Sequence, residues 1–225
     1  MWEDQAALDS FAGVARIFPL PSLVLFPGID QGLHIFEHRY RQMTADALAS
    51  DQLITLVLLR PDWHDDYDAK PAIESVACLG RIVEHERMSD GRYNLHLRGL
   101  ARLAVDSEIA DDDKLYRLAN GRIVPALGTG DWPGAIDHRG NLRDAVLARF
   151  AKDSPAHAQL TALFAGDSPL DIVCDQLGYC LPLPLPFKQQ LLAEPDAGLR
   201  AELLVAALRP SGNSGRTFPP KFSSN

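Results

Sequence analysis

His34 and His38 are four residues apart, a spacing at which one helix can present both imidazoles to a single metal ion. The surrounding pattern does not fit that helix. Residues 33–36 alternate like a strand, and helical spacing begins only after them. Because no third ligand is evident, we predict that this pair holds no metal.

An acidic loop at residues 62–68 could offer several ligands to a cation. Its ionisable side chains are Asp62, His64, Asp65, Asp66 and Asp68. A calcium-binding loop also needs a glycine and a final glutamate at fixed positions, and this loop meets neither requirement. We therefore expect a solvated loop and no metal site.

The same loop carries two aromatic residues, Trp63 and Tyr67. Aromatic side chains in a charged loop can anchor a partner, because they bury a large area and lose little conformational entropy. The alternative is that they fold back onto their own domain. Trp63 and Tyr67 are the candidate partner-binding residues that the sequence offers.

No catalytic constellation is recognisable in the sequence. Glu84 and Glu86 flank His85 in a strand pattern, so the two carboxylates would lie on the face opposite the imidazole. There is no Gly-x-Ser-x-Gly or Ser-x-x-Lys motif, and residues 128–130 are only half of a phosphate-binding loop. We predict that the chain is not an enzyme and has no catalytic residues, no metal and no cofactor.

Composition and charge restrict the partners. The 225 residues are 46% hydrophobic and 23% charged, as in an ordinary globular protein, and the formal net charge is -8. Nucleic-acid binding usually depends on clustered Lys and Arg that neutralise phosphates, so this acidic balance argues against it.

Location follows from what the sequence lacks. The longest apolar stretch, residues 53–59, is too short to span a bilayer, and the first residues do not have the pattern of a signal peptide. Cys78, Cys174 and Cys180 form no even disulfide set, so we expect three buried thiols. The expected location is cytoplasmic, with no membrane partner.

The first half of the chain has the pattern of strands. The expected strands cover residues 16–18, 33–36, 53–59, 76–86, 93–99, 100–109 and 116–124. Asp90-Gly91 is the strongest hairpin signal, and residues 39–50 have the spacing of one amphipathic helix. About six strands around one short helix predict a compact, twisted β barrel or half-barrel.

After Pro125 the pattern changes to helices. Residues 126–136 are rich in glycine and proline and predict a linker, and helical spacing runs from Leu142 to Leu208. The Ser, Gly, Asn and Pro content of the last residues cannot support a core. We predict domains at residues 1–125 and 137–209 and a disordered tail at residues 210–225.

The string IFPLPSLVLFPG, residues 17–28, resembles the opening of the N-terminal domain of the Lon protease family. Further matching segments follow in the same order: the strand and helix at residues 33–50, the apolar strand at 53–59, CLGRI at 78–82, LRGL at 97–100 and KQQLL at 188–192. The resemblance extends from about residue 17 to about residue 208. No phosphate loop and no protease dyad of Ser and Lys occur in the sequence.

This resemblance implies an α+β fold, with a mixed, twisted, PUA-like β pseudo-barrel that contains one short helix and precedes a C-terminal helical bundle. It also implies a non-catalytic polypeptide-binding module, acting as an adaptor or regulator. The partner would be an unfolded or extended polypeptide, or one specific protein. The alternative is a PUA-like RNA-binding protein, against which the net charge of -8 argues.

Overall fold

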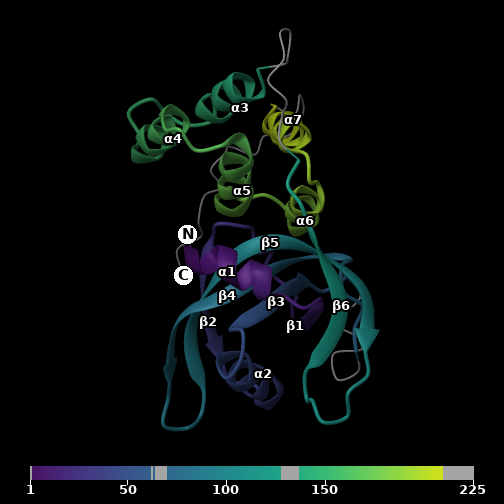
Figure 1. Cartoon of the computed structure of the whole chain (residues 1–225). Coiled ribbons are helices and arrows are strands. Elements are labelled where there is room, and N and C mark those ends of the chain that lie inside the picture. Colours follow the sequence, from purple (N-terminus) through teal and green to yellow (C-terminus); the bar gives the residue numbers. More distant parts are fainter. Residues whose placement is uncertain (1, 62, 64–69, 128–136, 210–225) are drawn as a thin grey trace. The chain divides into compact units, whose positions relative to one another are not determined.

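The computed structural model describes residues 2–61, 63, 70–127 and 137–209. Its sheet has six strands in the order β2-β5-β4-β3-β1-β6, and β6 also pairs with β5. The strands are β1 (Val14–Leu20), β2 (Asp30–Ile35), β3 (Leu53–Leu58), β4 (Val76–Arg87), β5 (Tyr93–Ile109) and β6 (Arg117–Val124). Strand pairing therefore returns to β5 and closes a ring of five strands, with β2 added on the outside (Figure 1).

The closed sheet is irregular and is not a clean barrel. β1 and β3 run parallel, whereas the other pairs are antiparallel. The register shifts twice between β4 and β5 and once between β5 and β6. Such bulges bend a strand and increase its twist, which lets the long β5 pair with β2 and β4 near its start and with β6 near its end.

Helix α2 (His38–Leu48) and β2 form the crossover that the parallel strands β1 and β3 require. The buried residues of α2 recur at three- and four-residue steps: Tyr40, Met43, Thr44 and Ala47. All six residues of β3 are buried, as predicted for a strand covered on both faces. The predicted helix at residues 39–50 and the predicted buried strand are confirmed.

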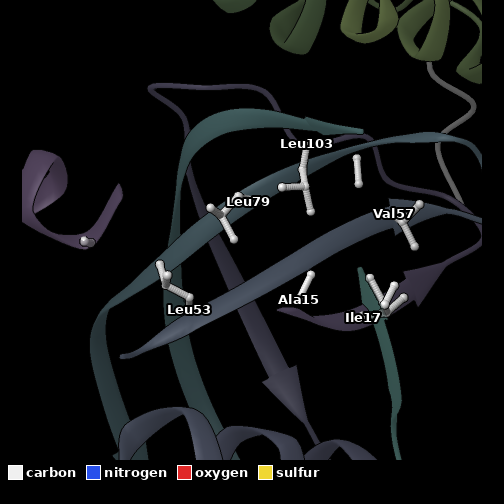
Figure 2. Close-up of a cluster of buried hydrophobic side chains, with 9 residues drawn as sticks. Ala15, Ile17, Leu53, Val57, Leu79 and Leu103 are labelled. Atoms are coloured by element: carbon white, nitrogen blue, oxygen red, sulfur yellow. The ribbon is translucent and has the colours of Figure 1, made fainter. Parts of the chain in front are cut away.

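One apolar core is shared by all five strands of the ring. It contains Ala15, Ile17, Leu53, Val57, Ala77, Leu79, Leu103 and Ala119, of which six are labelled in Figure 2. Each of these side chains is at most 2% exposed. Since every strand of the ring contributes to the same cluster, burial of this cluster favours closure of the sheet.

The remaining helices are α1 (Trp2–Ser10), α3 (His138–Leu147), α4 (Pro155–Ala165), α5 (Leu170–Cys180), α6 (Leu185–Ala193) and α7 (Ala197–Leu208). Three of these helices begin at a residue whose side chain caps the N-terminus. Asp137, Ser154 and Asp196 each accept a hydrogen bond from a backbone N–H three residues later. Arg139 of α3 donates to the carbonyls of Phe164, Gly166 and Ser168, which satisfies the C-terminal end of α4.

The chain divides into two compact units. The first comprises Met1–Leu127 and Asp175–Pro195, and the second comprises Gly128–Cys174 and Asp196–Asn225. In the first unit, buried Arg102 of β5 donates to Asp175 of α5 at 3.0 Å and to the carbonyl of Leu192 in α6 at 2.9 Å. These bonds attach the end of α5 and all of α6 to the sheet.

The predicted mixed α+β class is confirmed, but several details differ. Helix α1 was not predicted at all. Residues 93–99 and 100–109 form one continuous strand, in which Gly99 lies so close to the carbonyl of Phe26 that a Cβ would collide with it. Cys78 and Cys174 are buried as expected, whereas Cys180 is exposed at the last residue of α5, so that expectation was wrong.

Candidate functional site

The first unit contains a cavity of about 280 Å³ beside α2 and the start of β6. It is lined by Pro19, Arg39, Tyr40, Leu59, Lys70, Pro71, Ile109, Asp111, Lys114, Leu115, Tyr116 and Arg117. Seven of these twelve residues are apolar or aromatic, and four are cations. A cavity of this size and mixture suits one or two side chains of a ligand.

The cavity wall is fixed by contacts between segments far apart in the sequence. The ring of Tyr40 on α2 packs on Phe18 of β1, with 4.6 Å between the ring centroids. Leu59 forms a β-bridge with Ile73, which closes the loop that contains Lys70. Arg117 of β6 donates to the carbonyl of Pro71 at 2.8 Å. The 59–73 loop is therefore held against β6 at its base.

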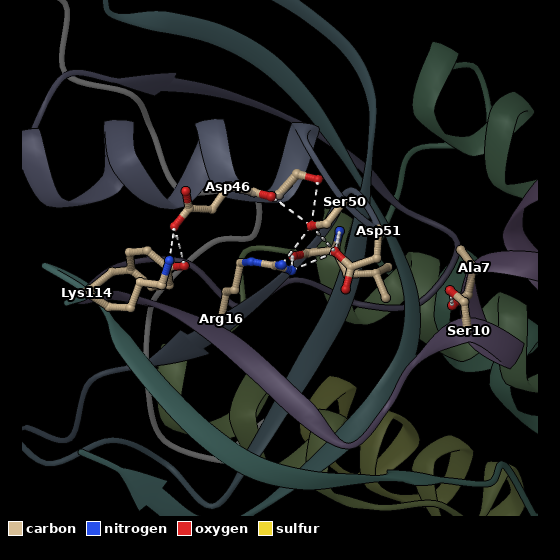
Figure 3. Close-up of polar contacts among 10 residues, drawn as sticks. Ala7, Ser10, Arg16, Asp46, Ser50, Asp51 and Lys114 are labelled. Carbon is tan, nitrogen blue, oxygen red and sulfur yellow. Dashed lines mark hydrogen bonds and ion pairs between the residues drawn. The ribbon is translucent and has the colours of Figure 1, made fainter. Parts of the chain in front are cut away.

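Asp46 of α2 anchors two residues of the cavity lining. It accepts hydrogen bonds from Lys114 Nζ at 2.9 Å and from the Tyr116 hydroxyl at 2.8 Å (Figure 3). Burial acts to raise the pKa of the Asp46 carboxyl, but these two hydrogen bonds and the charges of Lys114 and Arg16 together outweigh burial, and the pKa lies below its usual value. Burial and the bond to Asp46 together raise the pKa of Tyr116 to about 12.

A second polar cluster holds the end of α2 on β1. Arg16 donates to Asp51 at 2.6 Å and to the Ser50 hydroxyl at 2.8 Å, and Figure 3 shows the three side chains converging. Asp51 also accepts from the backbone N–H of Leu53, at the start of β3. Because both clusters involve α2, the helix that supplies Arg39 and Tyr40 to the cavity is fixed at several points.

A second hollow of about 250 Å³ also includes residues of α2. Its lining includes His38, Arg41 and Tyr93, and it shares Leu115 with the first cavity. Leu115 is 52% exposed, and its backbone N–H donates to the Gln42 side chain at 2.8 Å. An exposed leucine that is held in place between two hollows is a suitable contact for an apolar side chain of a ligand.

The second unit has a hollow of about 540 Å³ lined by residues of α3 and α7 and by Arg209. Its lining is His138, Asn141, Asp144, Ala201, Glu202, Val205, Ala206 and Arg209. Its apolar members are two alanines and one valine, whereas the first cavity includes Leu115, a leucine that is 52% exposed. We therefore regard the first cavity as the candidate site.

Of the two residues predicted from the sequence, the structure describes only Trp63, which is not among the described residues that line this cavity. Trp63 lies in a short turn, half-buried, with its backbone N–H bonded to the carbonyl of Arg60 at 3.2 Å. Tyr67 and most of the acidic loop lie outside the described residues. The cavity itself was missed, because its residues come from several separate segments and share no sequence motif.

The described lining of the cavity includes no serine, threonine, cysteine or histidine. His34, considered above as a metal ligand, bonds Asn94 at 2.7 Å, and His38 begins α2. In the part of the chain that the structure describes, no group of three or more His, Cys, Asp or Glu could hold a metal ion.

Within the same described ranges, no helix combines the length and apolar character needed to cross a membrane.

Comparisons with known proteins agree with this geometry. Residues 14–209 match the family described as the ATP-dependent protease La (LON) substrate-binding domain. The chain is 24% identical over 190 residues to a Lon protease of Xanthomonas oryzae pv. oryzae, and this match covers 84% of the chain and 22% of that relative. The chain thus corresponds to about a fifth of the relative's length.

Two solved structures have a similar fold. A Lon N-terminal domain protein from Xanthomonas campestris is 26% identical, with a TM-score of 0.62, and the match covers 86% of this chain and 97% of that one. The N-terminal domain of a Mycobacterium avium complex Lon protease is 15% identical, with a TM-score of 0.66, and the coverage is 88% and 98%.

Proposed function

We propose that this chain, which belongs to the family of ATP-dependent protease La (LON) substrate-binding domains, is a polypeptide-binding module without catalytic activity. The observation that carries the proposal is the family match, which extends over residues 14–209. Such a module would act as an adaptor or regulator. Its partner would be an unfolded or extended polypeptide, or one specific protein.

The cavity beside α2 supports this proposal. Leu115, which is 52% exposed, offers apolar area for a ligand side chain, and the cations of the lining offer donors to its carbonyls or carboxylates. An extended chain loses backbone freedom when it docks, which offsets much of the gain from burial. We expect a dissociation constant in the micromolar range, on the order of 8 kcal/mol of binding free energy.

Trp63 and Tyr67 remain our proposed partner-binding residues. Their loop begins next to Leu59 and ends next to Lys70, and both of these residues line the cavity. A ligand that fills the cavity would therefore come close to the bases of the loop that carries the two aromatics.

RNA is the second candidate, and four cations in the lining favour it: Arg39, Lys70, Lys114 and Arg117. Three of these cations already bond to Glu37, Asp46 and Glu108, which reduces the positive charge available to phosphate. With a net charge of -8 for the chain as well, polypeptide is the better candidate.

Several finer expectations are part of the same proposal. We propose that the closed sheet is a PUA-like pseudo-barrel, that the C-terminal helices form a bundle, that domain boundaries lie near residues 125 and 137, and that the location is cytoplasmic. The predicted linker from residue 128 onward and the predicted disordered tail at residues 210–225 lie outside the described residues.

Fluorescence polarisation with the full chain tests the function. A labelled, permanently unfolded protein should bind with micromolar affinity, and a labelled RNA of similar size should not bind. The chain should neither hydrolyse ATP nor cleave the bound polypeptide. RNA binding that weakens steeply with salt would favour the second candidate, and absence of binding to either probe would leave one specific folded protein as the partner.

A further inference from the structure

Helix α1 is attached to the first unit by few side chains. It precedes the residues that match the family, which begin at Val14. Of its residues after Trp2, only Ala7 is buried, at 8% exposed, and Leu8 and the following Phe11 are half-buried against the shared core. Fixing a nine-residue helix costs conformational entropy, and so few buried side chains offset little of that cost.

The acidic end of α1 lies on two arginines of the sheet. Arg81 of β4 and Arg98 of β5 are directly opposite one another in the strand register. Like charges at such positions repel. Asp4 lies within 2.8 Å of Arg81 and 3.8 Å of Arg98, and Glu3 lies 3.2 Å from Arg81. The helix therefore supplies carboxylates at a place where the sheet presents two cations.

The charges around Asp4 agree with the pairing of the α1 carboxylates with the two arginines. Burial acts to raise the pKa of the Asp4 carboxyl, but the hydrogen bond and charge of Arg81, together with the charges of the N-terminus and Arg98, outweigh burial, and the pKa is below its usual value. Arg98 is also bonded to Asp30 of β2 at 2.7 and 2.8 Å, so it keeps one carboxylate when α1 is absent. Among the residues that the structure describes, Arg81 forms ion pairs with Glu3 and Asp4 alone, both on α1.

We propose that the surface beneath α1 is a second binding surface, which takes acidic helices of partner proteins and which α1 occupies in the free chain. We call it the Arg81–Arg98 surface: the two arginines together with the core residues that Ala7, Leu8 and Phe11 contact. α1 itself defines the ligand chemistry, namely carboxylates in the first turn followed by small and medium apolar side chains one to two turns later.

This surface is distinct from the cavity beside α2 and does not depend on polypeptide binding there. The ion pairs of Glu3 and Asp4 with the two arginines are partly exposed, and partly exposed pairs weaken as salt is added, so the attachment of α1 is expected to be salt-sensitive. A partner helix with more apolar contacts would displace α1 by competition, since both cannot occupy the surface at once.

The test uses the full chain and a labelled synthetic peptide of residues 2–13. Asp4→Arg places a third cation beside the two arginines and should release α1. The peptide should then bind the Asp4→Arg variant at least about tenfold more tightly than the wild type, which is about 1.4 kcal/mol. Asp9→Arg is the matched control, because Asp9 lies on the same helix and, within the described part of the chain, its side chain bonds only Gln5.

Adding Arg81→Ala to Asp4→Arg should abolish the gain in peptide affinity. Equal peptide binding by the Asp4→Arg and Asp9→Arg variants would overturn the proposal, as would a gain that survives Arg81→Ala. Thermal unfolding of each variant shows whether it is folded. Failure with this peptide leaves the polarisation experiment on unfolded protein unaffected, so the two proposals fail separately.

Hydrogen exchange of the wild type gives an independent measurement if Asp4→Arg does not fold. The amides of α1 should lose protection as salt rises, while those of β4 and β5 keep theirs. Protection of α1 equal to that of the sheet at all salt concentrations would make α1 a permanent part of the core and overturn the proposal.

Discussion

The first unit contains two ion pairs of similar chemistry in opposite environments. The side chains of Arg102 and Asp175 are 3% and 4% exposed, whereas those of Lys114 and Asp46 are 33% and 31% exposed. A buried pair cannot exchange its partner for water or a ligand without a large cost, but a pair at a cavity can. The difference separates residues that hold the fold from residues that are available for binding.

Breaking the buried pair should give the largest effect on stability. Asp175→Ala leaves the Arg102 guanidinium buried without its carboxylate, which should cost about 3–5 kcal/mol of unfolding free energy. Lys114→Met, at the cavity, should cost less than about 1 kcal/mol. Chemical denaturation followed by circular dichroism measures both variants. Similar losses for the two would show that the environments do not differ in the way described.

Tyr116→Phe should lower the free energy of unfolding by less than Asp175→Ala does, and the size of this loss should depend on pH. Near neutral pH the loss of the bond to Asp46 should cost about 1 kcal/mol. The raised pKa means that the folded chain holds the phenol proton more tightly than the unfolded chain does. This contribution is fully present below about pH 10 and is lost as the pH rises toward about 12.

Denaturation of both proteins at pH values from about 8 to about 11 checks this prediction. The wild type should lose more stability than Tyr116→Phe over the upper part of this range, since the variant has no phenol to ionise. Cys78, whose pKa burial also raises, is present in both proteins and its contribution cancels in the comparison. If the free energies of unfolding of the two proteins fell in parallel as the pH rises, the account would be contradicted.

Local features of the fold could be predicted from the sequence because they depend on neighbouring residues. The hairpin follows from Asp90-Gly91, where Gly91 adopts a φ of 82°, and α4 begins where Ser154 caps it. Helix α1 was missed, because its residues lack a clear apolar face and its position depends on Arg81 and Arg98, far away in the sequence.

The cavity could not be predicted because non-local contacts assemble it. Asp46 is 68 residues from Lys114 and 70 residues from Tyr116 in the sequence, and the closure of β6 onto β1 brings them together. The closed ring was expected from the resemblance, whereas the pairing of β6 with both β1 and β5 is a property of the structure alone. The buried Arg102–Asp175 pair likewise had no signal in the local sequence.

The smallest expected effect on stability belongs to Leu115→Ser, which also tests the central claim that the cavity beside α2 binds polypeptide. Leu115 is 52% exposed at the cavity, and Leu199 of α7 in the second unit, at 48%, gives a matched control. Both changes are expected to leave unfolding free energy within about 0.5 kcal/mol. The decisive measurement is the dissociation constant of each variant for a labelled unfolded protein. Leu115→Ser should weaken binding about fivefold, because covering the exposed part of a leucine contributes about 1 kcal/mol, and Leu199→Ser should leave it unchanged. Equal affinities for the two variants would contradict the assignment of the binding site to this cavity.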